Sequence, residues 1–514
     1  MNGDAGAALA YHEDTKHSPD SVRRDTHRLD WDNQPRPYKL YTDLDALPLP
    51  RDFLVSNVPA LSAIAADEVG STRPRVPDLA TLATVLQYSA GITKHLRYPG
   101  GLMPFRAAAC TGALYHIELY LVCGDLPDLA AGVYQFGVHD FALRQLRAGD
   151  FRSTLIEASG REPAVVDAPT TIVFTSTFWR NAWKYQARAY RHAFWDNGTI
   201  LANTLAVASA YELPARVVVG FTDEPVSRLI GVDGEAEAAI SLVPLGYAPD
   251  ARPGSAPPVP AISPATVPLS AREVDYPAIH AVHASSSLHN ASEVVGWRES
   301  AASPPGSLAE PVDGAAHQVA LQPISGESLP SDAIERVIQR RGSSRRFERS
   351  AIGYDALSTV LAQATRGVPA DFEAPGGALA DPFLIVNAVD GLESGAYFYD
   401  WRRGGLQRLQ AGDFRDFASY LALTQPIAGD AAVNVYFLAD LEPILARLGN
   451  RGYRAAQLDA SVTAGRMYLA AYALGLGATG LTFFDDEVTR FFSPHAQGKS
   501  VMFLIALGNP ARRA

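Results

Sequence analysis

The sequence predicts a fold of mixed helices and strands that is present twice in one chain. Residues 200–211 form a mostly apolar segment without Gly or Pro, and the short β-branched run 217–219 follows it. This order is typical of a buried helix that leads into a core strand. The stretch has a weaker second copy 263 residues further along, and the pentapeptide Ala-Gly-Asp-Phe-Arg begins at both 148 and 411, with the same offset. We therefore interpret the chain as an internal duplication.

Identical residues support this alignment along the whole stretch. Because the offset stays constant, no insertion or deletion separates the two copies here. The identical pairs are Tyr190 and Tyr453, Arg191 and Arg454, Asp196 and Asp459, Leu213 and Leu476, and Phe221 and Phe484.

The composition is that of a globular protein. Of the 514 residues, 47% are hydrophobic and 19% are charged, so each repeat can bury a core. The net charge of −11 argues against a nucleic-acid or anionic-membrane partner, although a local basic pocket could still hold a phosphate. We find no signal-peptide pattern, and polar residues interrupt the most apolar window, 200–221. With only Cys110 and Cys123 for disulfides, the sequence predicts a cytoplasmic protein without a membrane span.

The first half is predicted to hold an arm and one repeat. Residues 1–50 are polar, with several prolines near their end, which indicates an extended arm rather than a domain. The first repeat, 51–249, shows an amphipathic helix at 79–90, then a strand at 113–122 and a hairpin within 133–152.

The second half is predicted to follow the same order after a linker. The linker, 250–329, is rich in proline, serine and alanine, but its middle part, 276–298, is more structured and is expected to pack on one repeat. The second repeat, 330–514, contains predicted helices at 334–341 and 354–365, a strand at 382–388 and a hairpin within 396–415.

Three segments resemble one family of flavoproteins. Residues 109–122, ACTGALYHIELYLV, and residues 183–198, WKYQARAYRHAFWDNG, are similar to segments of the SagB/ThcOx branch of azoline dehydrogenases. Residues 341–347, RGSSRRF, resemble the R-x-S-x-R-x-F motif of the wider nitroreductase-like superfamily. The resemblance extends over most of the chain, including the arm and residues 283–288 of the linker. It is carried by the order and spacing of the segments rather than by any single motif.

The resemblance implies an α+β fold in which a mixed or antiparallel sheet is flanked by helices. It also implies that FMN binds between two protomers, which here would be the two repeats of an intramolecular pseudo-dimer. The cofactor-binding residues that it implies are Arg106, Cys110, Thr111, Gly112, Arg341, Ser343, Arg345, Thr479, Gly480, Leu481, Arg512 and Arg513.

The physical chemistry of residues 341–345 agrees with a phosphate site. Arg341, Ser343 and Arg345 bring two guanidinium groups and a hydroxyl within reach of one turn, and an FMN phosphate needs several charge-assisted donors. The alternative is a solvated basic helix end, because further arginines lie nearby. Arg512 and Arg513 could join the clamp, and the alternative for them is a frayed basic tail.

The two repeats have lost complementary motifs. The first repeat has no R-x-S-x-R segment, whereas the second keeps it. The first keeps Lys184 and Tyr185, whereas Arg447 and Leu448 stand at the equivalent positions of the second. The sequence therefore predicts one composite flavin site, with the phosphate on the second repeat and the substrate on the first. The other site of the pseudo-dimer is predicted to be lost.

Lys184 and Tyr185 are the candidate catalytic residues. Free lysine and tyrosine titrate near pH 10, so either needs a lowered pKa to act as a base at neutral pH. In the azoline dehydrogenases that the chain resembles, the Lys-Tyr pair is the catalytic base pair, which removes a proton from a ring carbon as a hydride passes to flavin N5. The alternative is a surface lysine beside a packing aromatic ring.

Other residues depart from the family pattern or carry weaker signals. Ala109 and Cys110 replace the usual Pro-Ser, and His116 replaces a proline, which puts the usual azoline substrate in doubt. Residues 475–480, GLGATG, lie between a predicted helix and strand, the reverse of the dinucleotide-binding order, so a turn beside the flavin is favoured. His280 and His283 lack a third ligand, so no metal site is predicted.

We expect an FMN-dependent dehydrogenase that oxidises an azoline-type heterocycle, or a related bond, in a small-molecule, peptide or carrier-linked substrate. Oxygen is the expected acceptor. One alternative is an NAD(P)H-dependent nitro- or quinone reductase, and another is a non-catalytic scaffold of a modifying complex. The expected state is a monomeric pseudo-dimer or a homodimer, and a biosynthetic complex is a further possible partner.

Overall fold

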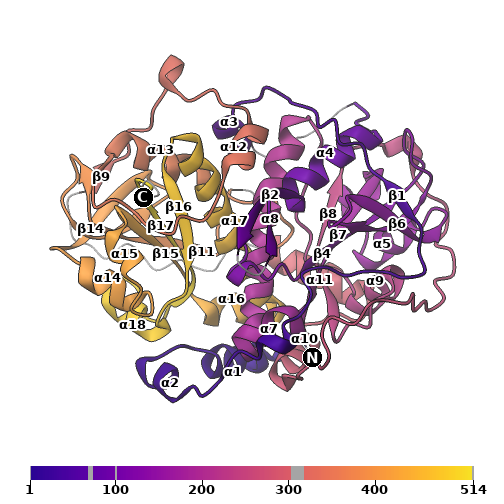
Figure 1. The fold of residues 1–514 in the computed structure, drawn as a ribbon, viewed down its shortest axis with the longest axis horizontal. Coiled ribbons are helices and arrows are strands. Elements are labelled where there is room, and N and C mark those ends of the chain that lie inside the picture. Colours follow the sequence, from indigo (N-terminus) through magenta and orange to yellow (C-terminus); the bar gives the residue numbers. More distant parts are fainter. Residues whose placement is uncertain (1, 67–72, 99–100, 303–317, 375, 512–514) are drawn as a thin grey trace.

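The computed structural model describes residues 2–66, 73–98, 101–302, 318–374 and 376–511. Two halves lie side by side, each built of one sheet with helices around it, and the long helices α8 and α17 cross between them (Figure 1). Both sheets are antiparallel throughout. This arrangement confirms the predicted α+β fold and the predicted duplication.

The sheet of the first half has the strand order β1-β6-β5-β4-β7-β8. A separate two-stranded hairpin, β2 and β3, leaves the body after α4. The elements are α3 (Ala60–Ile64), α4 (Leu79–Ala90), β1 (Ala46–Pro48), β2 (Ile92–Tyr98), β3 (Gly101–Arg106), β4 (Ile117–Cys123), β5 (Gly132–Gly137), β6 (Ala142–Ala148), α5 (Arg152–Ala158), α6 (Pro163–Asp167), β7 (Thr170–Thr177), α7 (Phe178–Tyr185), α8 (Ala189–Ala210), α9 (Asp223–Ile230) and β8 (Glu237–Leu245).

The sheet of the second half has the order β16-β17-β15-β11-β13-β14-β9. Its first strand, β9, comes from the segment predicted as linker. The elements are β9 (Gln318–Ala320), α12 (Ile334–Arg340), β10 (Ile352–Gly353), α13 (Tyr354–Ala364), β11 (Ala380–Val386), β12 (Val389–Asp390), β13 (Gly395–Asp400), β14 (Gly405–Ala411), α14 (Arg415–Leu421), α15 (Pro426–Asp430), β15 (Val433–Ala439), α16 (Leu441–Leu448), α17 (Arg451–Ala473), β16 (Gly477–Leu481), α18 (Asp485–Phe492) and β17 (Ser500–Gly508).

Helices α8 and α17 meet at an axis of approximate two-fold symmetry. The two helices are almost entirely buried. A Cβ atom added to Gly465 would lie 2.6 Å from the Cβ of Ala202, and one added to Gly198 would collide with Ser461. Each of these contacts joins a residue to its own counterpart 263 positions away, as happens only on a two-fold axis. The repeats therefore pack as the subunits of a symmetric dimer would.

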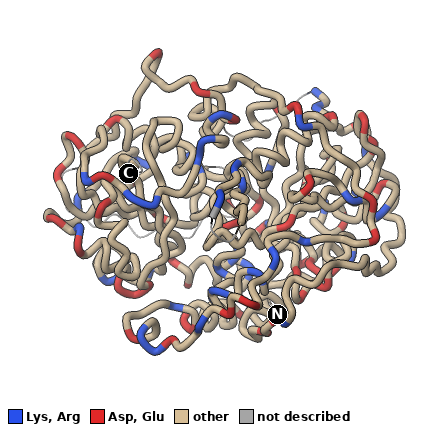
Figure 2. Tube along the Cα trace, viewed as in Figure 1, with Lys and Arg blue, Asp and Glu red and all other residues tan. Residues whose placement is uncertain are grey.

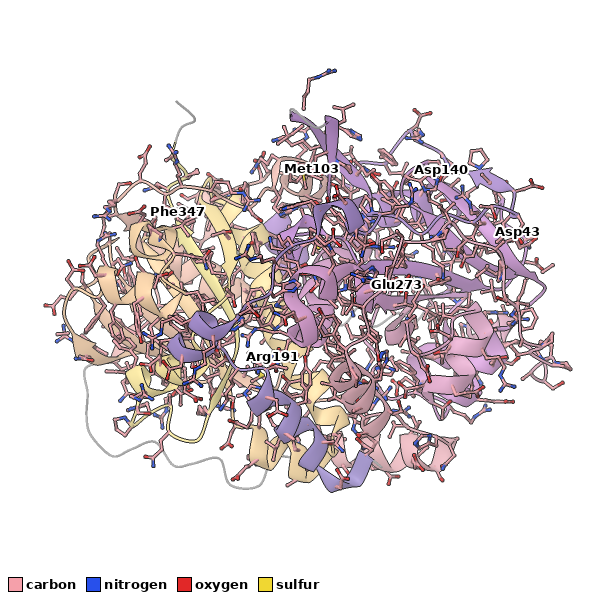
Figure 3. All side chains as sticks on the ribbon, turned by 60° about the horizontal axis from the view of Figure 1, so that its bottom comes forward. Asp43, Met103, Asp140, Arg191, Glu273 and Phe347 are labelled. Atoms are coloured by element: carbon pink, nitrogen blue, oxygen red, sulfur yellow. The ribbon has the colours of Figure 1, made fainter. Side chains whose placement is uncertain are left out.

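The arm differs from the prediction, because it is not extended. Residues Gly6–Asp14 form helix α1 and Pro19–Arg24 form helix α2, and both follow the lower side of Figure 1. Buried Arg191, which Figure 3 labels, donates to the carbonyl oxygen of His12 at 2.5 Å and to Thr15 Oγ1 at 3.0 Å. These contacts tie the arm to the first repeat, while a hydrogen bond from Ala8 N to Asn450 Oδ1, 2.8 Å long, ties it to the second.

The linker contains a counterpart of this arm helix. In α10 (Pro277–Ser285), the carbonyl oxygen of His283 and the hydroxyl of Ser286 just after it accept hydrogen bonds from Arg454, both 2.8 Å long. Because Arg454 is the counterpart of Arg191, the duplication includes an arm helix in each half. The sequence expectation that the middle of the linker packs on one repeat is wrong. In α11 (Ala291–Ala302), Trp297 donates to Leu448 of the second repeat, and Arg298 donates to carbonyls of the first.

Some predicted element limits shift for local reasons. The strand predicted at 113–122 begins at Ile117, because a 3-10 turn at Thr111–Ala113 and the left-handed φ of 50° at Tyr115 precede it. The run 217–219 is not a strand of the sheet but forms isolated bridges to Ala370 and Leu242. Gly477–Leu481 belongs to strand β16 rather than to a turn. Among the described helices, none is long and apolar enough to cross a membrane.

Candidate active site between the repeats

A cavity of about 420 Å³ opens between the two repeats. The loop 109–113, the end of α7 and one face of α8 form its wall from the first repeat, and the turn 343–345 and β16 form its wall from the second. The volume is typical of pockets that bind cofactors or small molecules. The predicted site residues that line it are Cys110, Thr111, Gly112, Lys184, Tyr185, Ser343, Arg345, Thr479, Gly480 and Leu481.

Packing of the arm fixes the end of α7, where Lys184 stands. Trp183 is buried, its ring lies 5.3 Å from that of Trp31, and its Nε1 donates to the carbonyl oxygen of Asp30 at 2.9 Å. The helix then stops because Gln186 takes a left-handed φ of 51°. With one side of the last turn anchored in this way, Lys184 and Tyr185 border the cavity.

Two cations face the cavity from opposite repeats. Neither half-buried Lys184 nor exposed Arg345 has a carboxylate partner among the described residues. Burial, together with the positive charge of Arg345, lowers the pKa of Lys184 below that of free lysine. Such a pair attracts an anionic ligand, and a lysine with a lowered pKa is a better base at neutral pH.

The pKa of Tyr185 shifts in the opposite direction from that of Lys184. Burial, with added repulsion from Asp196, raises the pKa of Tyr185 far above that of free tyrosine, so its hydroxyl remains protonated. The ring packs edge-on against His192 at 4.5 Å, and Lys184 Nζ lies 5.3 Å from its centroid. A Cβ atom at Gly112 would come within 2.8 Å of the hydroxyl, so only glycine fits there. A protonated hydroxyl can donate a hydrogen bond, whereas the predicted role as a base would need a lowered pKa.

Asp196 of α8 organises the loop that carries Cys110 and Thr111. One carboxylate oxygen accepts from Thr111 N at 2.8 Å, and the other accepts from Thr111 Oγ1 at 2.8 Å and from Cys110 Sγ at 2.9 Å. Burial and the neighbouring carboxylate raise the pKa of the Cys110 thiol, which therefore stays protonated and donates. His116 Nε2 lies 2.9 Å from the same carboxylate. His116 thus belongs to the support of the loop and does not line the cavity.

Several cavity residues were missed by the sequence analysis. Asp196 could have been recognised, because it is identical in both repeats, but nothing in the sequence linked it to the loop. The spacing of His192 and Trp195 puts them on the cavity face of α8, but this face can be identified only when the position of the helix is known. The other missed lining residues include Ser344, Gln425, Ile427, Tyr468, Thr482 and Phe503.

The wall from the second repeat includes two hydroxyl groups without hydrogen-bond partners among the described residues. The turn 343–345 is fixed on β16 by a hydrogen bond from Ser344 N to the carbonyl oxygen of Ala478, 2.9 Å long. The buried hydroxyl oxygens of Ser344 and Thr482 have no hydrogen-bond partner in the described part of the chain. Buried polar atoms are nearly always paired, so these two indicate a polar ligand.

Two predicted cofactor residues, Arg341 and Arg106, are described but do not line the cavity. Arg341 Nε donates to the carbonyl oxygen of Ala107 at 2.8 Å and its Nη2 to that of Arg106 at 3.0 Å, so it fastens the second repeat to the loop of the first. The guanidinium of Arg106 is buried and donates to the carbonyl oxygens of Pro37 and Ile117. Arg512 and Arg513 lie outside the described residues.

Metal ligation has no support in the described ranges, where no group of three or more His, Cys, Asp or Glu side chains could hold an ion. His280 lies 2.6 Å from Asp275, and His283 is buried 3.4 Å from the hydroxyl of Tyr190.

Comparison with known proteins decides the family. The model of the nitroreductase family matches residues 106–247 and, separately, residues 338–509. The chain belongs to the nitroreductase family. Each matched region contains one of the crossing helices and all strands of one sheet except an edge strand, β1 or β9.

Relatives of this nitroreductase-family protein include both single-domain and full-length matches. McbC of Escherichia coli, a microcin B17-processing protein, is 28% identical over 134 residues, which are 25% of this chain and 49% of McbC. MJ1384 of Methanocaldococcus jannaschii, provisionally named a nitroreductase, is 27% identical over 161 residues, or 30% of this chain and 81% of its own. A crystal structure from Anabaena variabilis, provisionally named likewise, aligns over 98% of this chain and 99% of its own, with a TM-score of 0.77 and 27% identity.

The equivalent site in the second half of the pseudo-dimer is filled by protein. Val217, the counterpart of Gly480, donates to the carbonyl oxygen of Pro369 at 2.8 Å and accepts from Asp371 N at 3.0 Å. The Asp371 carboxylate also accepts from Val219 N and Gly220 N, both at 2.8 Å. Residues 369–371 thus pair with the backbone of residues 217–220 in this half.

A salt bridge replaces the charged cavity wall in the same place. Arg447, the counterpart of Lys184, lies 3.0 Å from Glu373, the counterpart of Cys110. Whereas Lys184 faces open space, Arg447 is neutralised by a buried carboxylate of its own repeat.

Proposed function

We propose that this protein is an FMN-dependent dehydrogenase with a single flavin site in the cavity between its repeats. The observation that carries the proposal is the convergence of unpaired groups from both repeats on one cavity. Among the described residues, Arg345 has no carboxylate partner and the buried hydroxyls of Ser344 and Thr482 have no hydrogen-bond partner, which fits the phosphate of a polar cofactor. Lys184 faces these groups from the first repeat.

The proposed roles follow the walls of the cavity. Ser343, Ser344 and Arg345 hold the phosphate, while the 110–112 loop and the β16 residues 479–481 border the ring. Arg341 contributes to the site indirectly. It fixes the position of residues 106–107 and does not face the cavity. When bound, FMN supplies the hydride acceptor at its N5 atom.

We propose that Lys184 is the base that takes a proton from the substrate carbon. Its pKa is lowered by burial and by Arg345, so a larger fraction of the amine is neutral at physiological pH. Tyr185, which stays protonated, donates a hydrogen bond to the substrate or to the amine and keeps the lysine side chain over its ring. This assignment replaces the base pair of the sequence prediction with one base and one donor.

The proposed substrate class is an azoline-type ring in a peptide-derived or carrier-linked molecule, as in the SagB/ThcOx branch. The similarity to McbC, whose name describes the processing of microcin B17, supports a peptide context. A reductase that takes electrons from NAD(P)H is the second candidate, favoured by the family match itself.

The absorbance spectrum of the purified protein, with flavin and polypeptide quantified, tests the proposal. We expect a yellow protein with one FMN per chain. A ratio near two would overturn the single site, and a colourless protein that does not take up FMN would favour a scaffold role. Rapid bleaching of the bound flavin by NADPH, without oxidation of a synthetic thiazoline peptide, would favour the reductase.

A further inference from the structure

The hairpin β2–β3 is an isolated pair of strands that precedes the cavity loop 109–113 in the chain. Its strands pair with each other from Lys94 opposite Phe105 to Tyr98 opposite Gly101, and the residues described for this chain place no third strand on either side. Figure 3 shows Met103 of this hairpin near the outer edge of the molecule. An unpaired strand edge is a template for another extended chain.

The two edges of the hairpin are not equivalent. Pro104 lies in β3 and has no backbone N–H, and proline is one means by which edge strands avoid further pairing. Strand β2, with the sequence ITKHLRY, contains no proline. The edge available for strand addition is therefore the outer edge of β2.

The side chains of the hairpin favour an acidic partner with apolar residues. Residues 92–106 contain no Asp or Glu, although the whole chain carries a net charge of −11, and acidic and basic residues are interspersed over the trace as a whole (Figure 2). Lys94, His95 and Arg97 are exposed, and Leu102, opposite Arg97, is 62% exposed. Because successive residues of a strand point to opposite faces, Lys94 shares one face with Leu96 while His95 and Arg97 share the other. Both faces thus combine positive charge with apolar surface.

The base of the hairpin is continuous with the cavity wall. Its last residue, Arg106, is followed directly by Ala107, and Arg341 binds the carbonyl oxygens of both. Ala107 N also donates to the carbonyl oxygen of Gly91 at 2.8 Å, which closes the base of the hairpin. Two residues later the chain enters the 109–113 loop that lines the cavity. A chain bound to the hairpin is thereby held beside the reaction site.

We propose that the outer edge of β2 binds an acidic, extended segment of the peptide substrate by strand addition, remote from the ring that is oxidised. Backbone hydrogen bonds supply the affinity, and on each face the positive and apolar side chains select both acidic and aliphatic residues. This inference rests on the proposed peptide substrate and adds the place where its unreacted part docks.

Fluorescence anisotropy on the full chain tests the docking site with a fluorescein-labelled peptide of repeated Glu-Glu-Val-Val, which presents both Glu and Val on each face of the added strand. We expect the double variant Lys94→Glu/Arg97→Glu to weaken binding roughly tenfold or more. The matched control is Arg402→Glu/Arg403→Glu, which makes the same charge change at the tip of the β13–β14 hairpin and should leave binding unchanged. Equal weakening by both pairs would show only the effect of net charge and would overturn the proposal.

Peptides with N-methyl groups at alternate residues test strand addition on the unaltered protein. Two such peptides methylate the two edges of the probe strand, and we expect one of them to lose binding while the other keeps it. Equal binding of both would contradict backbone pairing. Binding of phosphatidylglycerol vesicles through Lys94 and Arg97, without binding of the peptide, would assign the hairpin to a lipid surface instead. Bound flavin is measured in parallel, so failure of the proposed flavin site is seen independently of peptide binding.

Discussion

The same aspartate position has different surroundings in the two repeats. In the first repeat, Asp196 accepts hydrogen bonds from Cys110 and Thr111 and holds their loop at the rim of an open cavity. In the second, Asp459 accepts from the backbone N–H groups of Leu379 and Ala380, and burial raises its pKa to about 7. The same residue thus supports a cavity loop through side-chain and backbone donors in one repeat and binds backbone N–H groups in the other.

The contacts between the repeats have stayed symmetric while the cavities diverged. Arg188 and Arg191 of the first repeat form buried salt bridges with Asp485 of the second, at 3.1 and 2.6 Å. Their counterparts, Arg451 and Arg454, both lie 2.7 Å from Asp223 of the first repeat. Breaking either buried cluster would leave an uncompensated charge, which explains why both persist. The salt bridges between the repeats are thus alike in both halves, whereas the residues around the two cavity positions differ.

The largest expected difference between the halves is in catalysis. Lys184→Ala should lower the oxidation rate of a thiazoline peptide by about 10²–10⁴-fold and leave bound FMN unchanged, because only the proposed base is removed. Steady-state kinetics per bound flavin measure this. Arg447→Ala, at the equivalent position of the filled site, is the control and should keep the rate per flavin. Activity that survives in Lys184→Ala would remove the lysine from the mechanism.

A smaller effect is expected on cofactor retention. Arg345→Ala removes a charge-assisted contact to the phosphate and should weaken FMN binding about 10–100-fold, measured by titrating apoprotein with FMN and following flavin fluorescence. Arg346→Ala changes an exposed neighbour outside the cavity and should not alter the titration. Similar curves for the two variants would contradict the phosphate clamp.

Arg341→Ala distinguishes a direct from an indirect role. Because Arg341 binds the carbonyls of residues 106–107, its loss should displace the loop as well as weaken FMN retention. We expect a several-fold weaker FMN titration, together with faster hydrogen exchange over 106–112. Unchanged exchange with weakened FMN binding would instead indicate direct contact with the phosphate.

Replacing the loop glycine by alanine should reduce turnover only in the first repeat. Gly112 has a φ of +59° and no room for a Cβ beside Tyr185, so Gly112→Ala should reduce turnover several-fold and lower stability by on the order of 1 kcal/mol. Gly376→Ala carries similar backbone strain at φ +75° but meets open space. It should lower the melting temperature without changing turnover. Equal turnover losses would show that strain, not the contact with Tyr185, is responsible.

The smallest expected effect is on the pH dependence of stability. The folded protein keeps a proton on Asp459 up to about pH 7, whereas the unfolded chain releases it near pH 4. The raised pKa therefore makes the free energy of unfolding fall as pH rises from about 4 to 7, by a few kcal/mol at most. Asp459→Asn should flatten the melting temperature across this range. A variant that follows the wild-type pH profile would show that the carboxyl does not titrate there.

Local patterns were predictable from the sequence. The helix predicted at 79–90 is α4 residue for residue, because its apolar spacing, its Asp78 cap and the following glycine act within one segment. The duplication was also visible, because identities at one constant offset need no structural knowledge. Lys184, Tyr185 and the 341–345 segment were found through their resemblance to a known family, and the cavity brings Lys184, Tyr185 and Arg345 together.

Features that depend on long-range packing were not predictable. The relation between α1 and α10 becomes apparent only when both are seen against Arg191 and Arg454. The filling of the second site by 369–371 depends on bridges between distant segments of weak local pattern. The protonated state of Tyr185 follows from burial beside Asp196, which the sequence leaves open.

The crossing of α8 and α17 places Gly198 against Ser461 on the symmetry axis. In a dimer of identical subunits, a position on the axis faces itself, so a small residue can never oppose a larger one there. Joining both copies in one polypeptide lifts that restriction, and it also makes assembly independent of dilution. Gly198 and Ser461 can therefore differ across the axis, so the two faces of this contact can fit each other without having to be identical.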